Sequence, residues 1–145
     1  MNLLFKKLYI SSDHAGFKLK EIIKKKFIKK KIKVIDIGPK TDKSVDYPDF
    51  AKKLSRCVLL KKSNMGILVC GSGTGMAMSA NKFKKIRAAV CYNQASTRLS
   101  RQHNNANILA LGARLIKKAD AIRLVNIFLS TKFEGGRHLR RVKKI

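Results

Sequence analysis

Acidic residues are scarce in this chain. Its 145 residues include 34 lysines and arginines but only 8 aspartates and glutamates, which gives a formal net charge of +26. No acidic residue occurs between Asp49 and Asp120. Because catalytic divalent metals bind through several carboxylates, we expect no metal centre. Tryptophan is absent and there are three tyrosines, which leaves few rings on which nucleic-acid bases could stack.

Cysteines are few, and long apolar runs are missing. Cys57, Cys70 and Cys91 form no C-x-x-C pair, which argues against a disulfide framework and a zinc site and fits a reducing cytoplasm. The apolar run within Met1–Ile10 is too short for a signal peptide and lacks a cleavage site. No stretch approaches the ~18 apolar residues of a membrane span. We therefore expect a cytoplasmic protein without a membrane partner.

Lysines are frequent along the chain, and eight of them lie in one segment, residues 18–31. Between residues 18 and 31 the lysines alternate with Leu19, Ile22, Ile23, Phe27 and Ile28 at helical spacing. This pattern predicts an amphipathic helix whose lysines, Lys20 and Lys24 among them, face water. Nucleic-acid binding is the alternative that such a charge raises. We favour the solvated helix face, and so expect no nucleic-acid partner.

Apolar runs and chain breakers predict strands that alternate with helices. Strands are expected at 8–12, 32–37, 66–70, 86–90 and 107–111, with helices from about 17 to 30 and at 48–61, 76–84, 94–102 and 120–129. Hydrophobic residues make up 45% of the chain, which is typical of a globular protein. Short strand–helix alternation predicts one domain, residues 1–145, with an α/β fold: a three-layer α/β/α, Rossmann-like arrangement around a five-stranded parallel sheet.

The rest of the chain is arranged around the segment that follows the third expected strand. The apolar run Gly66–Val69 ends at Cys70, and Gly71-Ser72-Gly73-Thr74-Gly75 follows at once. In open α/β sheets, ligands bind at the carboxyl ends of the strands. Backbone N–H groups in such a loop, together with a helix N-terminus, attract an anion and lower the pKa of a thiol.

The glycine loop does not match three familiar phosphate- or nucleotide-binding motifs. The dinucleotide fingerprint G-x-G-x-x-G requires a third glycine where Met76 stands, and a Walker A loop requires Gly-Lys-Ser/Thr. A cysteine phosphatase loop of the form C-x5-R would also need an arginine in place of Met76. The structural alternative is a glycine turn that only lets a helix pack closely.

Further polar residues follow other strands or close helices. They are Asp13, His14, His103, Asn104 and Arg114, with Arg137 and Arg141 four residues apart in the basic tail. Arginines suit phosphate, which they bind through two parallel hydrogen bonds. A thiol base beside N–H donors suits proton abstraction next to a carbonyl, because the developing charge is an oxyanion.

Taken together, these motifs resemble the B-type ribose-5-phosphate isomerases, a family that also holds isomerases of allose and galactose phosphates. The matching segments are Ser12-Asp13-His14-Ala15-Gly16-Phe17, Asp46-Tyr47-Pro48, Cys70-Gly71-Ser72-Gly73-Thr74-Gly75, Ala80-Asn81-Lys82-Phe83, Leu99-Ser100-Arg101-Gln102-His103-Asn104 and Glu134-Gly135-Gly136-Arg137-His138 with Arg141-Val142. The resemblance implies an aldose–ketose isomerase of the pentose phosphate pathway that needs no cofactor or metal. It also implies a homodimer or tetramer with each active site at a subunit interface.

The resemblance assigns a role to each matching position. Cys70 is the implied base that moves a proton between C1 and C2 of ribose 5-phosphate, and His103 the acid/base that opens the furanose ring. Asp13 would handle hydroxyl protons near the ring oxygen. The other implied contacts are Gly71, Ser72, Gly73, Thr74 and Gly75 to the enediolate, Asn104 to sugar hydroxyls, Tyr47 as an aromatic wall, and His14, Arg114, Arg137 and Arg141 to substrate or phosphate.

Two positions depart from the family pattern. Asn105 stands where an aspartate is usual, which puts support of His103 in question, and Val45 stands where threonine is common. Some relatives use a glutamate near Thr74 as the base, but residues 70–83 contain no acid here.

The remaining candidates are assigned structural roles, and two other functions stay open. We expect Cys57 to pack in a helix, Cys91 to end the fourth strand, and His138 to be structural. A six-carbon sugar phosphate is the alternative substrate, and a basic nucleic-acid-binding module is the alternative class of protein.

Overall fold

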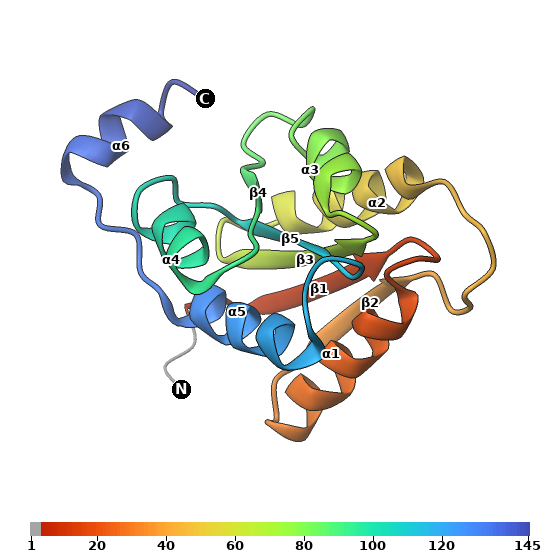
Figure 1. The fold of residues 1–145 in the computed structure, drawn as a ribbon. Coiled ribbons are helices and arrows are strands. Elements are labelled where there is room, and N and C mark those ends of the chain that lie inside the picture. Colours follow the sequence, from red (N-terminus) through yellow and green to blue (C-terminus); the bar gives the residue numbers. More distant parts are fainter. Residues whose placement is uncertain (1–3) are drawn as a thin grey trace.

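The computed structural model describes residues 4–145, so the first three residues of the Met1–Ile10 stretch lie outside the described part. The elements are β1 (Lys7–Ser12), α1 (Phe17–Lys29), β2 (Val34–Gly38), α2 (Tyr47–Leu59), β3 (Asn64–Cys70), α3 (Thr74–Ala80), β4 (Ala88–Val90), α4 (Gln94–Gln102), β5 (Ile108–Gly112), α5 (Lys118–Ser130) and α6 (Gly136–Val142). The strands form one five-stranded sheet in the order β2-β1-β3-β5-β4, and every neighbouring pair is parallel (Figure 1).

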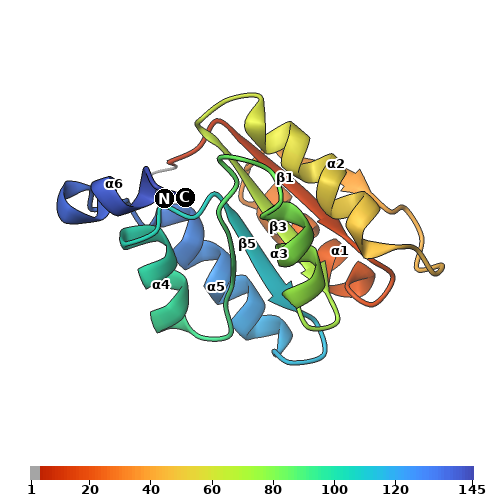
Figure 2. The same cartoon turned by 90° about the horizontal axis from the view of Figure 1, so that it is seen from above.

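Helices cover both faces of the sheet, which confirms the predicted three-layer α/β/α class. Helices α1 and α5 cover one face, with α4 packed on α5, while α2 and α3 cover the other (Figures 1 and 2). Helix α6 lies beyond the amino ends of the strands in both views. Among residues 4–145, no helix combines the length and the apolar character that a membrane crossing requires.

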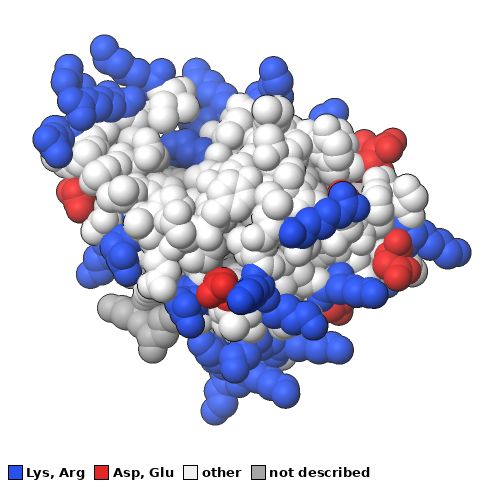
Figure 3. Space-filling model, viewed as in Figure 1, with Lys and Arg blue, Asp and Glu red and all other residues white. Residues whose placement is uncertain are grey.

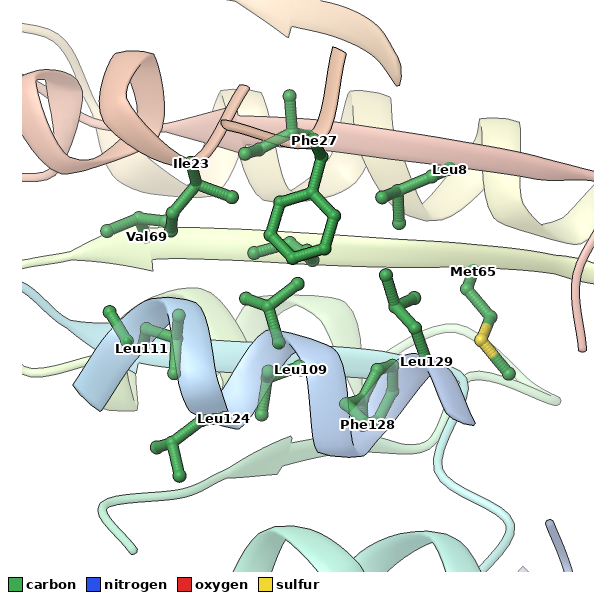
Figure 4. Packing of buried hydrophobic residues seen from close by; sticks show 14 of the residues in the cluster. Leu8, Ile23, Phe27, Met65, Val69, Leu109, Leu111, Leu124, Phe128 and Leu129 are labelled. Atoms are coloured by element: carbon green, nitrogen blue, oxygen red, sulfur yellow. The ribbon is translucent and has the colours of Figure 1, made fainter. Parts of the chain in front are cut away.

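The core consists of two apolar clusters, one on each side of the sheet. Figure 4 shows the first, to which α1 contributes Phe27, α5 contributes Phe128 and β3 contributes Val69, all fully buried. The second packs Leu54 of α2 and Met76 of α3 against the opposite sheet face. Strand β3 is buried along its whole length, because it lies at the centre of a sheet covered on both faces. Each large apolar side chain buried in this way contributes roughly 1.5–3 kcal/mol.

Several element boundaries differ from those expected. Strand β2 begins at Val34 rather than at residue 32, and β4 holds only residues 88–90. Helix α3 spans 74–80 rather than 76–84. It ends early because Asn81 turns its side chain to the next strand, where its amide donates to the Ala88 carbonyl at 2.9 Å and accepts the Ala88 N–H at 2.7 Å. The basic tail is helical, which places Arg137 and Arg141 one turn apart on α6.

The expectation that all lysines of α1 face water is wrong for Lys20. Its side chain is fully buried, and Nζ donates to Oδ1 and Oδ2 of Asp36 at 2.8 and 2.9 Å and to the Pro39 carbonyl at 2.7 Å. Lys24 is half-buried and donates to Asp36 and Glu21. The helix therefore turns two lysines toward β2, because three carbonyl and carboxylate acceptors there replace water around the Lys20 ammonium group.

Candidate active site

The sheet topology creates a crevice between β1 and β3. The chain leaves β1 over the face covered by α1 and leaves β3 over the face covered by α3, so the two following loops diverge. Ligands of open α/β sheets bind at this kind of switch point. The loop after β1 carries Asp13, and the loop after β3 starts at Cys70.

A hollow of about 280 Å³ opens at this point. Its lining residues are Asp13, Tyr47, Cys70, Gly71, Ser72, Gly75, Arg114 and Leu115. They come from the loops after β1, β3 and β5 and from the start of α2. Four surface hollows elsewhere on residues 4–145, of about 400 to 630 Å³, are larger, but none of them is lined by a thiol. The arrangement therefore concentrates a nucleophile, a carboxylate and a guanidinium in the smaller hollow.

Cys70 is held at the base of the loop with its thiol next to backbone donors. It is 5% exposed, and its Sγ accepts the Gly73 N–H at 3.1 Å. Gly73 has φ +82°, a left-handed conformation that glycine adopts without steric cost. The N–H groups of Gly71, Ser72 and Gly75 have no hydrogen-bond partner among residues 4–145. The loop thus offers free donors to a negatively charged group beside the sulfur atom.

The loop after β1 brings Asp13 to the same crevice. Asp13 is 7% exposed, and its Oδ1 accepts the Gly16 N–H at 2.9 Å. Gly16 lies so close to β3 that an added Cβ would stand 2.0 Å from the Val69 carbonyl oxygen. Only glycine fits there, and this close approach places the Asp13 carboxylate next to the end of β3.

The loops after β4 and β5 brace the glycine loop. Arg114 lines the hollow, and its N–H donates to the Gly71 carbonyl at 3.1 Å, while the Ala113 N–H donates to the Cys70 carbonyl at 2.8 Å. Tyr92 donates its hydroxyl to the Ser72 carbonyl at 3.1 Å. Sequence reasoning missed Tyr92. Its position just beyond the carboxyl end of β4 was the available signal.

Three predicted ligands, Gly73, His14 and Thr74, lie outside the lining of this hollow, and the Gly73 N–H is used by Cys70 Sγ. His14 is exposed, and its Nδ1 accepts the Val45 N–H at 3.2 Å, which ties the first loop to the segment before α2. Thr74 is exposed at the start of α3, where its N–H donates to the Ser72 hydroxyl at 3.3 Å.

A second group of predicted residues lies elsewhere in the chain. His103, Asn104, His138, Arg141, Val142 and Ile145 line a hollow of about 400 Å³. His103 caps the C-terminus of α4, and the arginine lies on α6. Arg137 is exposed on the same helix and does not line this hollow.

The two groups stand at opposite ends of the sheet. Cys70 pairs with Gly112 at the carboxyl end of β5, whereas His103 precedes the amino end of that strand. At ~3.3 Å per residue, the segment from Ala106 to Gly112 spans roughly 15–20 Å. Cys70 and His103 of one chain therefore do not face the same small molecule.

His103 belongs to a cluster that sequence reasoning did not assemble. Its ring stacks on His138 with centroids 4.2 Å apart and planes 11° apart. Glu134 Oε2 lies 3.9 Å from His103 Nε2 and 3.5 Å from His138 Nε2. Burial lowers the pKa of His138, and the charges of His103 and Arg137 act in the same direction. The spacing Glu134-x3-His138 was the available sequence signal.

Arg101 lies in the last turn of α4, next to His103, and holds this end of the helix in place through hydrogen bonds. Its Nε donates to the Thr131 carbonyl at 3.2 Å, and its NH1 donates to Asn105 Oδ1 at 3.1 Å. Burial, aided by the charge of Arg87, lowers the pKa of Arg101 to about 10. Asn105 thus supports Arg101, and its polar contacts do not include His103.

A doubly wound parallel sheet with a thiol and free N–H groups at its switch point is the architecture of an α/β enzyme that acts on a small, negatively charged molecule. The model of one family, described as Ribose/Galactose Isomerase, matches residues 8–145. The chain belongs to this family.

Similar proteins of known name cover almost the whole chain. Ribose-5-phosphate isomerase B of Escherichia coli is 41% identical over 140 residues, covering 97% of this chain and 94% of that protein. The crystal structure of a ribose 5-phosphate isomerase from Thermotoga maritima is similar with a TM-score of 0.94 and 48% identity, covering 99% of this chain and 97% of the other. Ribose-5-phosphate isomerase B from Mycoplasma genitalium with bound ribulose-5-phosphate has a TM-score of 0.91 and 42% identity, covering 95% and 92%.

Proposed function

We propose that this protein is an aldose–ketose isomerase that interconverts D-ribose 5-phosphate and D-ribulose 5-phosphate without a metal or cofactor. The observation that carries the proposal is the Cys70 thiol, which lies beside free N–H groups at the switch point of the sheet. The names of full-length relatives and the ribulose-5-phosphate bound by one of them support this substrate.

Ring opening comes first, because sugar phosphates exist mostly as rings. The anomeric hydroxyl loses its proton, the C1–O4 bond breaks to give the C1 aldehyde, and O4 takes up a proton. His103 moves these protons, because a neutral imidazole both accepts and donates one near neutral pH. Asp13 handles hydroxyl protons near O4, and Asn104 contacts the sugar hydroxyls.

The isomerisation step is then assigned to the glycine loop. The Cys70 thiolate removes the proton from C2, and the C–H electrons form the C1–C2 double bond of an enediolate. The negative charge develops on O1, where the N–H groups of Gly71, Ser72 and Gly75 and the Ser72 hydroxyl stabilise it. One such donor contributes ~3 kcal/mol. The proton of the C2 hydroxyl passes to O1, the thiol returns its proton to C1, the C2–O2 bond becomes the carbonyl, and ribulose 5-phosphate results.

Each complete site combines two copies of the chain. We infer this from the separation of Cys70 from His103, since one small substrate cannot reach both in one chain. Exposed apolar side chains support the contact: Met78 on α3, Leu115 in the lining of the first hollow and Leu139 on α6 are 65%, 59% and 42% exposed. A two-fold homodimer would hold two such sites, and a tetramer built from two dimers would hold four.

The charged residues of the two groups suit the phosphate end of the substrate. Arg114 from one copy, and Arg137 and Arg141 from the other, supply guanidinium groups that match phosphate oxygens. Tyr47 forms a wall of the first hollow, and His14 stands at its margin. All three cysteines are free thiols, which supports a reducing cytoplasmic location.

The test is conversion of ribose 5-phosphate to ribulose 5-phosphate in EDTA by wild type, Cys70→Ala and Cys57→Ala. We expect Cys70→Ala to lose 10²–10⁴-fold in rate, the range for removal of a general base. Cys57→Ala is the matched control, since this thiol packs in α2 away from the hollow. Activity that survives in Cys70→Ala would keep the isomerase but exclude Cys70 as its base.

A six-carbon sugar phosphate is the second candidate substrate, because the family description includes galactose. If folded wild-type protein fails to convert ribose 5-phosphate, six-carbon aldose phosphates are tested next. Lysine and arginine side chains gather over α1 and α6 (Figure 3), away from the first hollow. A nucleic-acid function would instead appear as duplex binding that falls steeply with salt.

A further inference from the structure

Three consecutive carbonyls of the glycine loop are each held by a donor from another segment. The loop after β5 supplies the backbone N–H groups that hold the Cys70 and Gly71 carbonyls, at 2.8 and 3.1 Å. The Ser72 carbonyl instead accepts the Tyr92 hydroxyl at 3.1 Å. The third carbonyl therefore depends on a side chain, which comes from just beyond the carboxyl end of β4.

Each of these carbonyls fixes the direction of the N–H group that follows it. A trans peptide is planar, so its C=O and N–H bonds point in opposite directions. The Ser72–Gly73 peptide has its carbonyl on the Tyr92 hydroxyl and its N–H on Cys70 Sγ, 3.1 Å away. Hydrogen bonds at the two ends of one peptide group polarise and strengthen each other. The Tyr92 hydroxyl thus acts on the donor that faces the thiol.

The same peptide lies directly against the end of β5. An added Cβ on Gly112 would stand 2.7 Å from the Ser72 carbonyl oxygen, and one on Gly73 would stand 3.1 Å from the Leu111 carbonyl carbon. This packing limits where the peptide lies. How the peptide plane is turned depends on the hydrogen bonds at its two ends, since the left-handed backbone of Gly73 carries no side chain that could hold it.

Tyr92 is itself held in place by its neighbours along the chain. Cys91 before it is 1% exposed, and its N–H donates to the Ala110 carbonyl at 3.3 Å. Asn93 after it caps α4, where its side chain accepts the Ser96 N–H at 2.8 Å. The backbone is fixed on both sides, so the tyrosine ring reaches the glycine loop from a set position although the side chain is 46% exposed.

We propose that Tyr92 is a positioning residue: its hydroxyl holds the Ser72–Gly73 peptide so that the Gly73 N–H stays directed at the Cys70 sulfur during proton transfer. Cys70 is 5% exposed, so negative charge on its sulfur depends on protein donors rather than on water. Tyr92 does not line the hollow and therefore acts through the loop. The catalytic effect rests on the proposed function, in which Cys70 is the base, but the anchoring of the loop does not.

The first test is amide hydrogen exchange, measured by mass spectrometry on full-length wild type and Tyr92→Phe, which keeps the ring and removes the hydroxyl. We expect exchange in residues 70–76 to become roughly 2–10-fold faster, the range for one lost hydrogen bond, while β1 exchanges as in wild type. Gln94→Ala is the matched control, since this exposed side chain is not among the hydrogen-bond partners of the loop in residues 4–145. Unchanged exchange in Tyr92→Phe, or an equal rise in Gln94→Ala, would overturn the anchoring.

Isomerase kinetics are the second test. The kcat of Tyr92→Phe should fall roughly 2–10-fold with KM unchanged within about twofold, because the hydrogen bond acts on proton transfer rather than on substrate binding. Gln94→Ala should keep both constants. An unchanged kcat in Tyr92→Phe, or a change confined to KM, would overturn the positioning role even if the loop exchanges faster. A folded wild type that does not isomerise ribose 5-phosphate would reject the proposed function alone, and the exchange comparison would still decide whether Tyr92 holds the loop.

Discussion

The ammonium group of Lys20 is buried between α1 and β2, where Asp36 and the Pro39 carbonyl surround it. A lysine in this position is stable only because its charge is paired and its donors are used. Asp36 in turn accepts from Lys24 and from the Gly38 N–H at 2.8 Å. At the scale of single residues, this network joins α1 to the strand at the sheet edge.

We expect Lys20→Ala to lower the free energy of unfolding by about 3 kcal/mol, because it leaves Asp36 without its buried partner. Urea unfolding monitored by circular dichroism measures the change. Lys18→Ala, an exposed lysine on the same helix, is the control and should change stability by no more than ~0.5 kcal/mol. Equal effects of the two substitutions would contradict the role of the Lys20 network.

The Asp36 network also predicts acid sensitivity. Burial by itself raises the pKa of Asp36, but hydrogen bonds from Lys20, Lys24 and Gly38 outweigh it, and the net pKa is lowered. A carboxyl group whose pKa is lower in the folded than in the unfolded protein stabilises the fold at pH values above its unfolded pKa of about 4. This stabilisation is lost as the pH falls through the folded pKa. The stability difference between wild type and Asp36→Asn should therefore shrink between pH 7 and pH 3 in urea unfolding. A difference independent of pH would refute this linkage.

The end of α4 is the element that positions His103. Arg101 is 5% exposed and ties this end to the segment after α5 through the Thr131 carbonyl. Asn105 contributes a neutral oxygen to Arg101 and has φ +48°, which asparagine tolerates. The buried guanidinium therefore has an amide oxygen, rather than a carboxylate, as its side-chain partner.

We expect Asn105→Asp to raise the free energy of unfolding by about 1 kcal/mol, because a charged acceptor strengthens the hydrogen bond to Arg101. Aspartate also tolerates the positive φ. Ser44→Asp is the matched control: it lowers the net charge equally but lies in an exposed loop. Thermal or urea unfolding at pH 7 compares them, and an equal gain in both would mean that only the net charge matters.

At the scale of the whole molecule, the proposed machinery is divided between the two ends of the sheet. The hollow around Cys70 lies at the carboxyl ends of the strands, and the hollow around His103 lies near their amino ends. Helix α6 extends beyond the sheet at the second end (Figure 2). This shape leaves each half-site open to a second copy.

Mixing two inactive variants tests whether sites are shared. When Cys70→Ala and His103→Asn chains assemble at random, half of the dimers are mixed, and each mixed dimer contains one intact site. We expect about a quarter of wild-type isomerase activity to return. The control mixes Cys70→Ala with Asp13→Asn, whose defects lie in the same hollow, so that every mixed site keeps one defect. No recovery in the first mixture would contradict the shared site.

The sequence by itself determined the order of strands and helices and the position of the glycine loop. The apolar run Gly66–Val69 can be recognised as a buried strand from adjacent residues alone, since a strand covered on both faces must be apolar throughout. Cys70 ends that run and Asp13 ends the first strand. Both were therefore expected at one edge of the sheet, because parallel strands have their carboxyl ends at the same edge. These inferences needed only neighbours along the chain.

Only the tertiary structure decided which residues meet. The buried state of Lys20 depends on Asp36, sixteen positions away, and no helical pattern contains that partner. The stacking of His103 on His138 and the wide separation of His103 from Cys70 depend on how α4 and α6 pack relative to the sheet. Long-range contacts of this kind arise from the fold as a whole, because the charge or ring of one residue is stabilised by groups that the chain brings near only after it has folded.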